Sequence, residues 1–257
     1  MRANEIMTDI IGAKYIEEHR GETVDTLKFG DENVEVTKIA TCLTITPDLI
    51  RDMKEWGAEL VITHEPTFYN HIDEFHPDRL SLEKKKALEE AGFTVYRYHD
   101  SMHLRAEDEV NLSFISRLGW EGEFDGDYHI TLTEGKTARE IAKEAGEALG
   151  IKHPRIVGNP DFKATHINLG TGARGNRHYS AFLNSDTDEV AICGELCEWE
   201  DCEPIRDAAQ FGWKKAIVIL GHAGSEKLAM EDFAKSIDKK YDGASVKYFD
   251  CGEIYTY

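Results

Sequence analysis

Apolar residues along the chain alternate between short runs rich in β-branched side chains and longer segments with helical spacing. Runs of the first kind are typical of buried strands, and segments of the second kind are typical of amphipathic helices. The short runs predict strands at 34–45, 58–64, 93–99, 189–195, 215–222 and 245–252, and a further strand that begins the segment 165–176 and leads into a glycine-rich turn. The longer segments predict helices at 47–57, 78–92, 107–119, 137–150, 203–212 and 225–238.

Local signals support the ends of several predicted helices. Pro47 suits the first turn of a helix, and Gly57 suits its C-terminal cap. Thr137 and Glu140 have the spacing of a capping box, in which each side chain bonds to the other residue's backbone N–H. These signals place the helices between the predicted strands.

The strand–helix order repeats in units of about 30 residues, which is typical of an α/β fold. Both halves of the chain show it, so we expect two facing α/β domains, each with a mixed sheet flanked by helices. The acidic, glycine-containing segment 121–129 is the expected boundary. The predicted domains are therefore 1–125 and 126–257, and the last helix and strand could pack back on the N-terminal domain.

Composition narrows the class of protein. The chain has 257 residues, of which 41% are hydrophobic, so it is expected to fold rather than to be disordered. It contains no apolar run of about 18 residues, and the first 22 residues are charged throughout, so neither a membrane span nor a secretory signal is expected. These features predict a cytoplasmic protein with no membrane partner.

The five cysteines are expected to be reduced thiols. Their number is odd, and the C-x3-C-x4-C spacing at 193–202 lacks the C-x2-C knuckle of structural zinc sites. We expect these side chains to be small buried hydrophobic groups. The five residues are Cys42, Cys193, Cys197, Cys202 and Cys251.

The chain is strongly acidic, with 30 basic and 49 acidic residues and a formal net charge of −19. Such a charge repels phosphate backbones at long range, so a nucleic-acid partner is not expected. Acidity also favours cations, but composition alone does not separate metal binding from solubility.

Candidate chemistry lies where three predicted strands end. One strand runs into His64 and Glu65, one into the segment 99–103, and one into His222 followed by Glu226. In α/β sheets, ligands bind beyond the carboxyl ends of the strands. Imidazole and carboxylate groups together suit Zn, Fe, Mn, Ni or Co. We therefore expect a metal site in the cleft between the domains.

The spacing of these residues defines the relative position of the side chains in one case and not in another. His222 and Glu226 are four residues apart, which places both on one face if the helix begins early enough. His99 and His103 have the same separation, but it crosses the end of a strand and does not define their geometry. A single histidine at a strand end is more often structural, and His99 fits that description best.

Other familiar motifs do not match. The segment GTGARGN at 170–176 lacks the spacing and the Lys-Ser/Thr of a phosphate loop, and no G-x-S-x-G elbow is present. Its glycines are expected to adopt positive φ in a turn. His166 and Arg174 flank that turn and could contact a phosphate, although a structural or solvent-exposed role is the simpler expectation.

Four blocks resemble a known family. They are GAELVITHEP at 57–66, VYRYHDSMH at 95–103 followed by NLSFISRLG at 111–119, CGELCEWEDCEPIRDAAQFG at 193–212, and GHAGSEKLAMEDFAKSI at 221–237. In this order and spacing they resemble the Ngg-interacting-factor-three-like proteins, whose members carry the name GTP cyclohydrolase I type 2 homologue. The resemblance covers most of the chain and fits the short form without an inserted domain.

The resemblance implies a dinuclear metal site with five ligands and a homohexameric ring built as a trimer of dimers. Carried over, three ligands fall on His64, His222 and Glu226. The other two positions depart, because Glu65 replaces a histidine and His103 replaces an aspartate. The set still holds three imidazoles and two carboxylates, so ligand number and charge are preserved. Recruitment of Asp100 and a single-metal site stay open as alternatives.

Such a site favours hydrolysis, because two ions about 3.5–4 Å apart can bridge a hydroxide and clamp a phosphoryl or carbonyl oxygen. Glu226 or Glu65 would bridge or orient the nucleophile. A small phosphorylated or cyclic-amide substrate, nucleotide-like in character, fits this chemistry. The alternatives are a non-catalytic metal-binding ring with a scaffold or regulatory role, and a structural α/β protein without metal.

Overall fold

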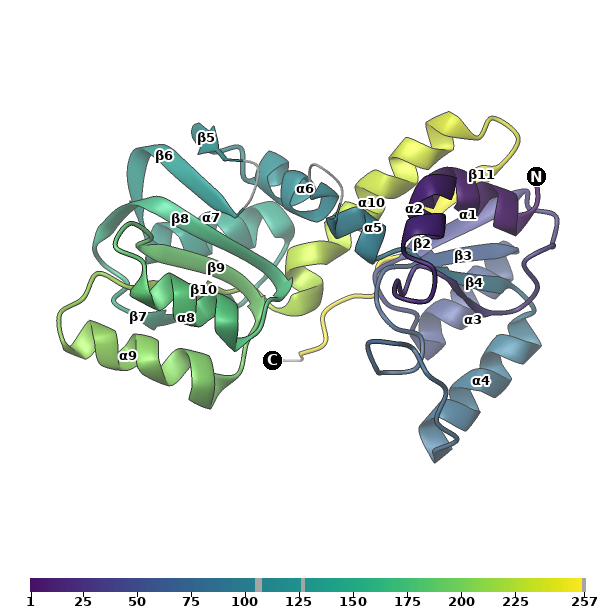
Figure 1. The fold of residues 1–257 in the computed structure, drawn as a ribbon, viewed down its shortest axis with the longest axis horizontal. Helices are drawn as coiled ribbons and strands as arrows, with labels where there is room; N and C mark the ends of the chain where they lie inside the picture. The colour runs from purple at the N-terminus through teal and green to yellow at the C-terminus, as the bar shows by residue number, and fades with distance from the viewer. Residues whose placement is uncertain (105–107, 126–127, 256–257) are drawn as a thin grey trace. The chain divides into compact units, whose positions relative to one another are not determined.

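The computed structural model describes residues 1–104, 108–125 and 128–255. The chain divides into two compact units, here called the first and the second unit (Figure 1). The first unit is Met1–Arg105 with Ala229–Gly252, and the second is Ala106–Leu228 with Glu253–Tyr257. Helix α10 (His222–Lys240) therefore begins in the second unit and ends in the first.

The first unit holds a mixed sheet with the order β1-β4-β3-β2-β11. All neighbours in it are parallel except β1 and β4. The strands are β1 (Leu27–Phe29), β2 (Lys38–Cys42), β3 (Leu60–Thr63), β4 (Thr94–Arg97) and β11 (Ser245–Tyr248). The helices are α1 (Ala3–Ile11), α2 (Ala13–Glu18), α3 (Pro47–Trp56), α4 (Arg79–Ala91) and the short α5 (Asp100–His103).

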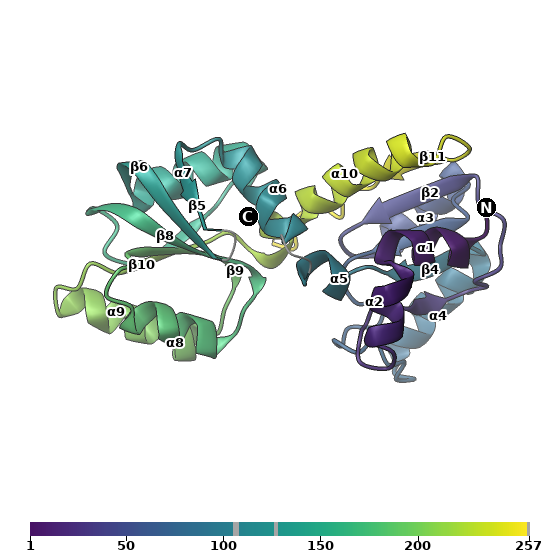
Figure 2. The same ribbon diagram turned by 45° about the horizontal axis from the view of Figure 1, so that its top comes forward.

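Helices cover both faces of this sheet. Figures 1 and 2 show α3 and α4 on one face and α1 with the later turns of α10 on the other. On the first face, Val61 and Val95 of the strands pack in one core with Met53 and Leu88 of the helices. On the second face, Thr41 Oγ1 donates to a carbonyl of α10, at 3.2 Å. The sheet is buried on both faces, as parallel sheets require.

The second unit holds a mixed sheet with the order β5-β6-β8-β9-β10-β7, in which β8, β9 and β10 run parallel. The strands are β5 (Gly122–Phe124), β6 (His129–Thr137), β7 (Arg155–Gly158), β8 (Lys163–Ala173), β9 (Val190–Glu195) and β10 (Ala216–Ile219). The helices are α6 (Glu109–Leu118), α7 (Ala138–Leu149), α8 (Asn176–Asn184) and α9 (Glu203–Gln210), with a π-helical turn at Glu198–Cys202.

The alternation of side chains along β9 shows how this sheet is covered. Val190 and Ile192 pack with α7, whereas Ala191 and Cys193 pack with α8 and α9. Successive side chains of a strand point to opposite faces, so each face receives its own helical layer. Figure 1 shows these layers on either side of the strands.

The predicted α/β class with two mixed sheets flanked by helices is confirmed. All six predicted helices and all seven predicted strands are present, and Thr137 and Glu140 form the expected capping box. Some elements were not predicted, including α1, α8 and β7. The domain boundary expected at 121–129 stays a prediction, and β5, which lies in that segment, pairs with residues 130–132 of β6.

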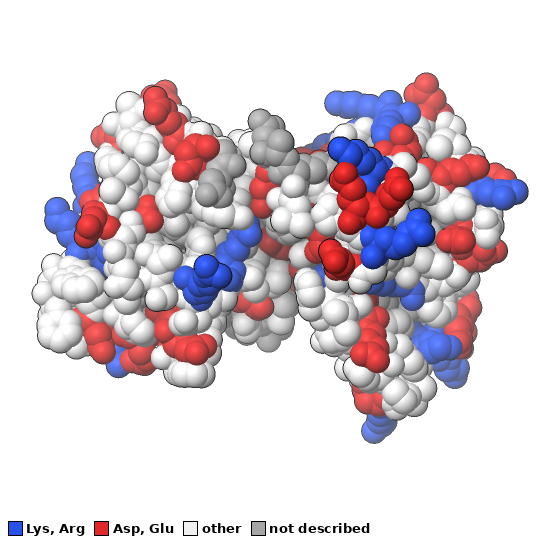
Figure 3. Space-filling model, in the orientation of Figure 1, with Lys and Arg blue, Asp and Glu red and all other residues white. Residues whose placement is uncertain are grey.

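None of the helices in the described part of the chain combines the length and the apolar character that crossing a membrane requires. On the face drawn in Figure 3, the Lys and Arg side chains of each unit are interspersed with Asp and Glu. The negative net charge is thus spread over this face together with its counter-charges.

Lys84 of α4 is a buried lysine with an unusual environment. Its residue is 2% exposed, and its Nζ lies 4.5 Å from the centre of the Tyr69 ring. Burial lowers the pKa of Lys84 to about 8, although Asp73 and the Cys42 thiol oppose the shift. Holding the ammonium charged at neutral pH therefore costs stability.

Raising the pH should relieve this cost. Between pH 8 and the ordinary lysine pKa of about 10.4, the unfolded chain still binds a proton that the folded chain has released, so stability rises with pH. Relative to Lys84→Met, the unfolding free energy of the wild type should increase by about 2 kcal/mol from pH 7 to pH 10. Urea denaturation at both pH values measures this. Lys86→Met, at a side chain that is 73% exposed, is the control without such a change.

Candidate metal centre

Two parallel neighbours, β3 and β4, bring the histidines of the first unit together. Thr63 pairs with Arg97 in the ladder, and Tyr98 N–H donates to Thr63 O at 2.9 Å. His64 directly follows β3, and His99 follows β4 by two residues. Because the strands are parallel, both side chains emerge at the same edge of the sheet.

Three imidazoles meet at this edge. Ring nitrogens of His64, His99 and His103 all lie within 4.8 Å of one another. His64 Nε2 is 3.2 Å from His103 Nε2, and the ring centres of His64 and His99 are 4.6 Å apart. His64 is almost fully buried, at 1% exposure. Imidazoles gathered in this way are the kind of group that can hold a divalent transition metal.

The hydrogen bonds of the outer ring nitrogens orient two of these imidazoles. His64 Nδ1 is 3.0 Å from Tyr98 O, which can only accept, so Nδ1 donates and Nε2 presents its lone pair. His99 Nδ1 likewise donates to Asp100 Oδ1 at 2.8 Å. Histidine ligands of metals characteristically donate their other N–H to a carbonyl or carboxylate. The donor chemistry therefore fits a metal ligated through Nε2.

Asp100 is held in its ionised form. Burial alone would raise its pKa, but hydrogen bonds from His99, from Val24 N–H and from the Thr23 hydroxyl outweigh it and lower the pKa below its usual range. Both carboxylate oxygens already accept hydrogen bonds within the first unit. This occupation favours an orienting role for Asp100 over direct metal ligation.

Asp25 fixes the turn that carries His99 and His103. Its carboxylate accepts from the backbone N–H groups of His99, Asp100 and Ser101, at 2.6–2.8 Å, and it is 4% exposed. A carboxylate at this position satisfies the N–H groups that the start of α5 leaves without partners in the helix. Sequence reasoning missed Asp25, which lies 74 residues from His99.

Arg97 lies beneath the loop that carries His64 and Glu65, and its side chain is fully buried. Its guanidinium donates to His64 O at 2.9 Å through Nε, and to His71 O through another nitrogen. It also lies 4.0 Å from Glu65 Oε2. Burial lowers the pKa of Arg97, against the raising effect of Glu65 and of Asp73. This guanidinium thus ties the start of the loop, at His64, to its middle, at His71.

His71 adds a fourth imidazole that the sequence did not single out. Its ring centre lies 5.6 Å from that of His99, and its residue is exposed. It belongs to the loop between β3 and α4, seven residues beyond His64, and no motif in the sequence marks it. Its placement beside His99 follows from the Arg97 contact with its carbonyl.

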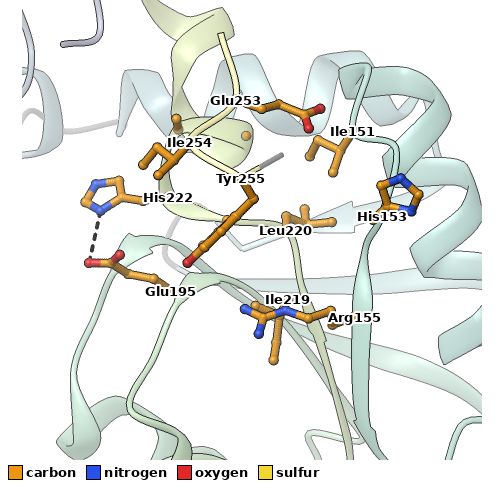
Figure 4. Close-up of a pocket in the computed structure, with 14 residues that line it drawn as sticks. Ile151, His153, Arg155, Glu195, Ile219, Leu220, His222, Glu253, Ile254 and Tyr255 are labelled. Atoms are coloured by element: carbon orange, nitrogen blue, oxygen red, sulfur yellow. Dashed lines mark ion pairs between the residues drawn. The ribbon is translucent and has the colours of Figure 1, made fainter. Parts of the chain in front are cut away.

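The second unit holds a smaller group of candidate ligands, which also lies just after a strand. His222 is the first residue of α10, so the four-residue spacing does place Glu226 on the same face. His222 Nε2 lies 3.0 Å from Glu226 Oε2, and its Nδ1 lies 3.3 Å from Glu195 Oε1 at the end of β9 (Figure 4). Glu226 is 3% exposed.

The glycine-rich segment of β8 makes room for this pair. Gly172 has φ of +65°, and a Cβ there would overlap the carboxylate of Glu226. Its N–H donates to Ser225 Oγ at 2.9 Å, and that hydroxyl donates to His222 O at 2.9 Å. The expected positive φ is found at Gly172 and Gly175 but not at Gly170, and Gly172 lies in β8 rather than in a turn. Its role is the close approach of β8 to the start of α10.

The predicted ligands therefore fall in two groups. His64, Glu65 and His103 belong to the first unit, and His222 and Glu226 belong to the second. The structure adds His99, which the sequence favoured as structural, to the group of the first unit. The two phosphate candidates have ordinary surroundings, since Arg174 pairs with Asp108 at 3.3 Å and the side chain of His166 is 46% exposed.

Comparison with known sequences decides the family. The sequence model described as Duf34/NIF3 (NGG1p interacting factor 3) matches residues 7–251. The chain belongs to the Duf34/NIF3 family. A relative in Clostridium perfringens, named GTP cyclohydrolase 1 type 2 homolog, is 26% identical over 185 residues, which are 67% of this chain and 70% of the relative.

Solved structures show the NIF3 fold. A Bacillus cereus protein related to NIF3 superposes with a TM-score of 0.78 at 14% identity, covering 100% of this chain and 99% of that one. A hypothetical protein of Staphylococcus aureus superposes with a TM-score of 0.77 at 16% identity and the same coverage. The family resemblance inferred from the sequence is thus confirmed.

Asp25→Asn tests the support of the histidine turn in this NIF3 protein. The amide removes the charge and leaves one acceptor oxygen for three N–H donors, so the free energy of unfolding should fall by about 2 kcal/mol. Urea denaturation at pH 7 measures the change. Asp31→Asn, at an exposed aspartate that accepts from Asn33 N–H, should change stability far less. Equal effects of the two variants would contradict the role given to Asp25.

Proposed function

We propose that this protein is a metal-dependent hydrolase that uses two divalent transition-metal ions. The proposed ligands are the five residues expected from the sequence, with His99 added. They are His64, Glu65, His99, His103, His222 and Glu226. The observation that carries the proposal is that ring nitrogens of His64, His99 and His103 converge. Two of these histidines, His64 and His99, donate a hydrogen bond through Nδ1 to an acceptor oxygen.

The donor set supports a transition metal rather than Ca²⁺ or Mg²⁺. Imidazole nitrogen suits Zn, Fe, Mn, Ni and Co, whereas Ca²⁺ and Mg²⁺ take oxygen ligands. Glu65 and Glu226 supply carboxylates, one from each unit. Arg97 Nη2 lies 4.0 Å from Glu65 Oε2, so a buried cation faces that carboxylate.

When bound, divalent ions would supply Lewis-acid chemistry for hydrolysis. The protein's own contribution is proton handling by two carboxylates. Glu226 is buried against His222, which restricts its rotamers, and its carboxylate is a group that can accept a proton. Glu65 is the second candidate base, and it is only slightly exposed.

The proposed substrate is a small phosphorylated or cyclic-amide compound with nucleotide-like character. The chemistry of a two-metal hydrolase fits such bonds. The name of the Clostridium perfringens relative, a GTP cyclohydrolase 1 type 2 homolog, supports the nucleotide class. We propose the homohexamer and the cytoplasmic location on the basis of the family resemblance alone.

Metal content tests the proposal directly. Untagged full-length protein purified without chelator should contain about two ions per chain by elemental mass spectrometry. His64→Ala and His222→Ala should each lose at least one ion, because each removes a nitrogen ligand. His76→Ala, at a histidine whose side chain is 65% exposed, should retain the wild-type content.

Near-zero metal that added Zn, Mn, Fe, Ni or Co cannot restore would contradict the proposal. It would mean that the changes at Glu65 and His103 have dismantled the site. Equal loss in His76→Ala and His64→Ala would point to non-specific binding by surface histidines and would also contradict it.

Glu226→Gln separates catalysis from binding. The amide keeps an oxygen donor but cannot accept the proton, so turnover should fall about 100-fold or more while metal content stays close to wild type. A screen of nucleotides and cyclic amides with the loaded protein measures the rate. Metal-loaded wild type without turnover of any of them would favour the non-catalytic ring instead.

A further inference from the structure

A pocket in the second unit opens beside the His222–Glu195 pair (Figure 4). Its walls come from the segment before β7, the ends of β9 and β10, the start of α10 and the C-terminal residues 253–255. All of these segments belong to the second unit. The pocket is therefore a feature of this unit alone.

Apolar side chains form much of the pocket wall. Ile151, Ile219, Leu220 and Ile254 line it together with the ring of Tyr255. In Figure 4, the Tyr255 side chain extends across the pocket, with its hydroxyl directed toward the side of Glu195. Tyr255 is 59% exposed, so its ring has a face available for stacking. A planar aromatic ring is the ligand group that such a wall fits.

The polar groups lie at two ends of the pocket. His222 and Glu195 lie on one side, and His153 and Arg155 lie on the other (Figure 4). Glu253, whose carboxylate also lines the pocket, lies between these two groups, so Arg155 is the group that would draw an anion to its own side. The Arg155 guanidinium pairs with Glu198 at 3.4 Å, but this is one contact for five N–H donors. The paired Glu198 carboxylate is itself 79% exposed, so a bound anion could replace it. Arginine in this setting suits phosphate or carboxylate.

We propose that this pocket binds a small molecule that joins a planar aromatic ring to an anionic group, with the ring against Tyr255 and the anion on Arg155. The nucleotide class satisfies this description, because a nucleobase carries the ring and a phosphate carries the charge. The inference rests on the proposed function, since it places the ligand beside His222. It names the substrate-recognition residues that the metal ligands do not supply.

Binding to metal-free protein tests the pocket without the metal centre. The full chain is stripped with chelator and dialysed, and GTP is titrated by calorimetry, since it carries both groups. Arg155→Met should weaken GTP binding about tenfold or more, because a charge-assisted contact to phosphate is lost. Tyr255→Ala should weaken it about fivefold or more, whereas Tyr255→Phe keeps the ring and should stay close to wild type.

Ligands that carry only the ring or only the phosphates serve as controls, together with a substitution of an arginine outside the pocket. Guanosine should bind weakly and respond to Tyr255→Ala but not to Arg155→Met, and tripolyphosphate should show the reverse. Arg139→Met removes an exposed arginine that pairs with Asp161 elsewhere in the second unit, and should leave GTP binding unchanged.

Three outcomes would overturn the inference. They are the absence of saturable GTP binding, equal weakening by Arg155→Met and Arg139→Met, and tripolyphosphate that binds as tightly as GTP with no effect of Tyr255→Ala. Metal content is measured separately, so a protein that binds metal but not GTP refutes this pocket alone. A protein that binds GTP but no metal refutes the proposed hydrolase alone.

Discussion

The parallel pairing of β3 with β4 is the constraint on which the candidate metal centre depends. Its register sets Thr63 beside Arg97, so the chain leaves both strands at one edge, where His64 and His99 follow. A shift by one residue would turn these side chains to the opposite face. The apolar residues Val61 and Val95, buried in the core under α3 and α4, make that shift costly.

Two buried charged side chains hold the backbone segments that carry the histidines. Asp25 collects three backbone N–H groups at the start of α5, and Arg97 binds the carbonyls of His64 and His71. Each of these buried charged side chains forms hydrogen bonds with the backbone of the loop that it holds. These bonds offset part of the free energy lost when the charge is removed from water. His64 and His99 are therefore oriented by the protein itself, because their Nδ1 contacts with Tyr98 O and Asp100 Oδ1 leave Nε2 as the nitrogen that each ring presents.

Much of the fold could be predicted from the sequence because periodicity and capping are local. Pro47, Gly57 and the Thr137 capping box sit where the structure begins or ends its helices. The glycine φ at Gly172 was also foreseeable, but its contact with Glu226 was not, because it joins residues far apart in the chain.

The site was predictable only in part. His64, His103 and His222 were identified from strand ends and from the family pattern. Asp25 and Arg97 hold backbone groups of distant residues, and such contacts produce no recognisable motif in the sequence. His99 was assigned a structural role because a lone histidine after a strand usually has one. The short helix α5, held by Asp25, is what turns it toward His64 and His103.

The central claim is that these three histidines form a preorganised ligand set. Anomalous diffraction at the zinc edge, from crystals of the full-length protein grown with Zn²⁺, tests it most directly. The account predicts an anomalous peak about 2.0–2.1 Å from Nε2 of His64, His99 and His103. Zinc peaks confined to other residues, with no anomalous density beside these imidazoles, would contradict it.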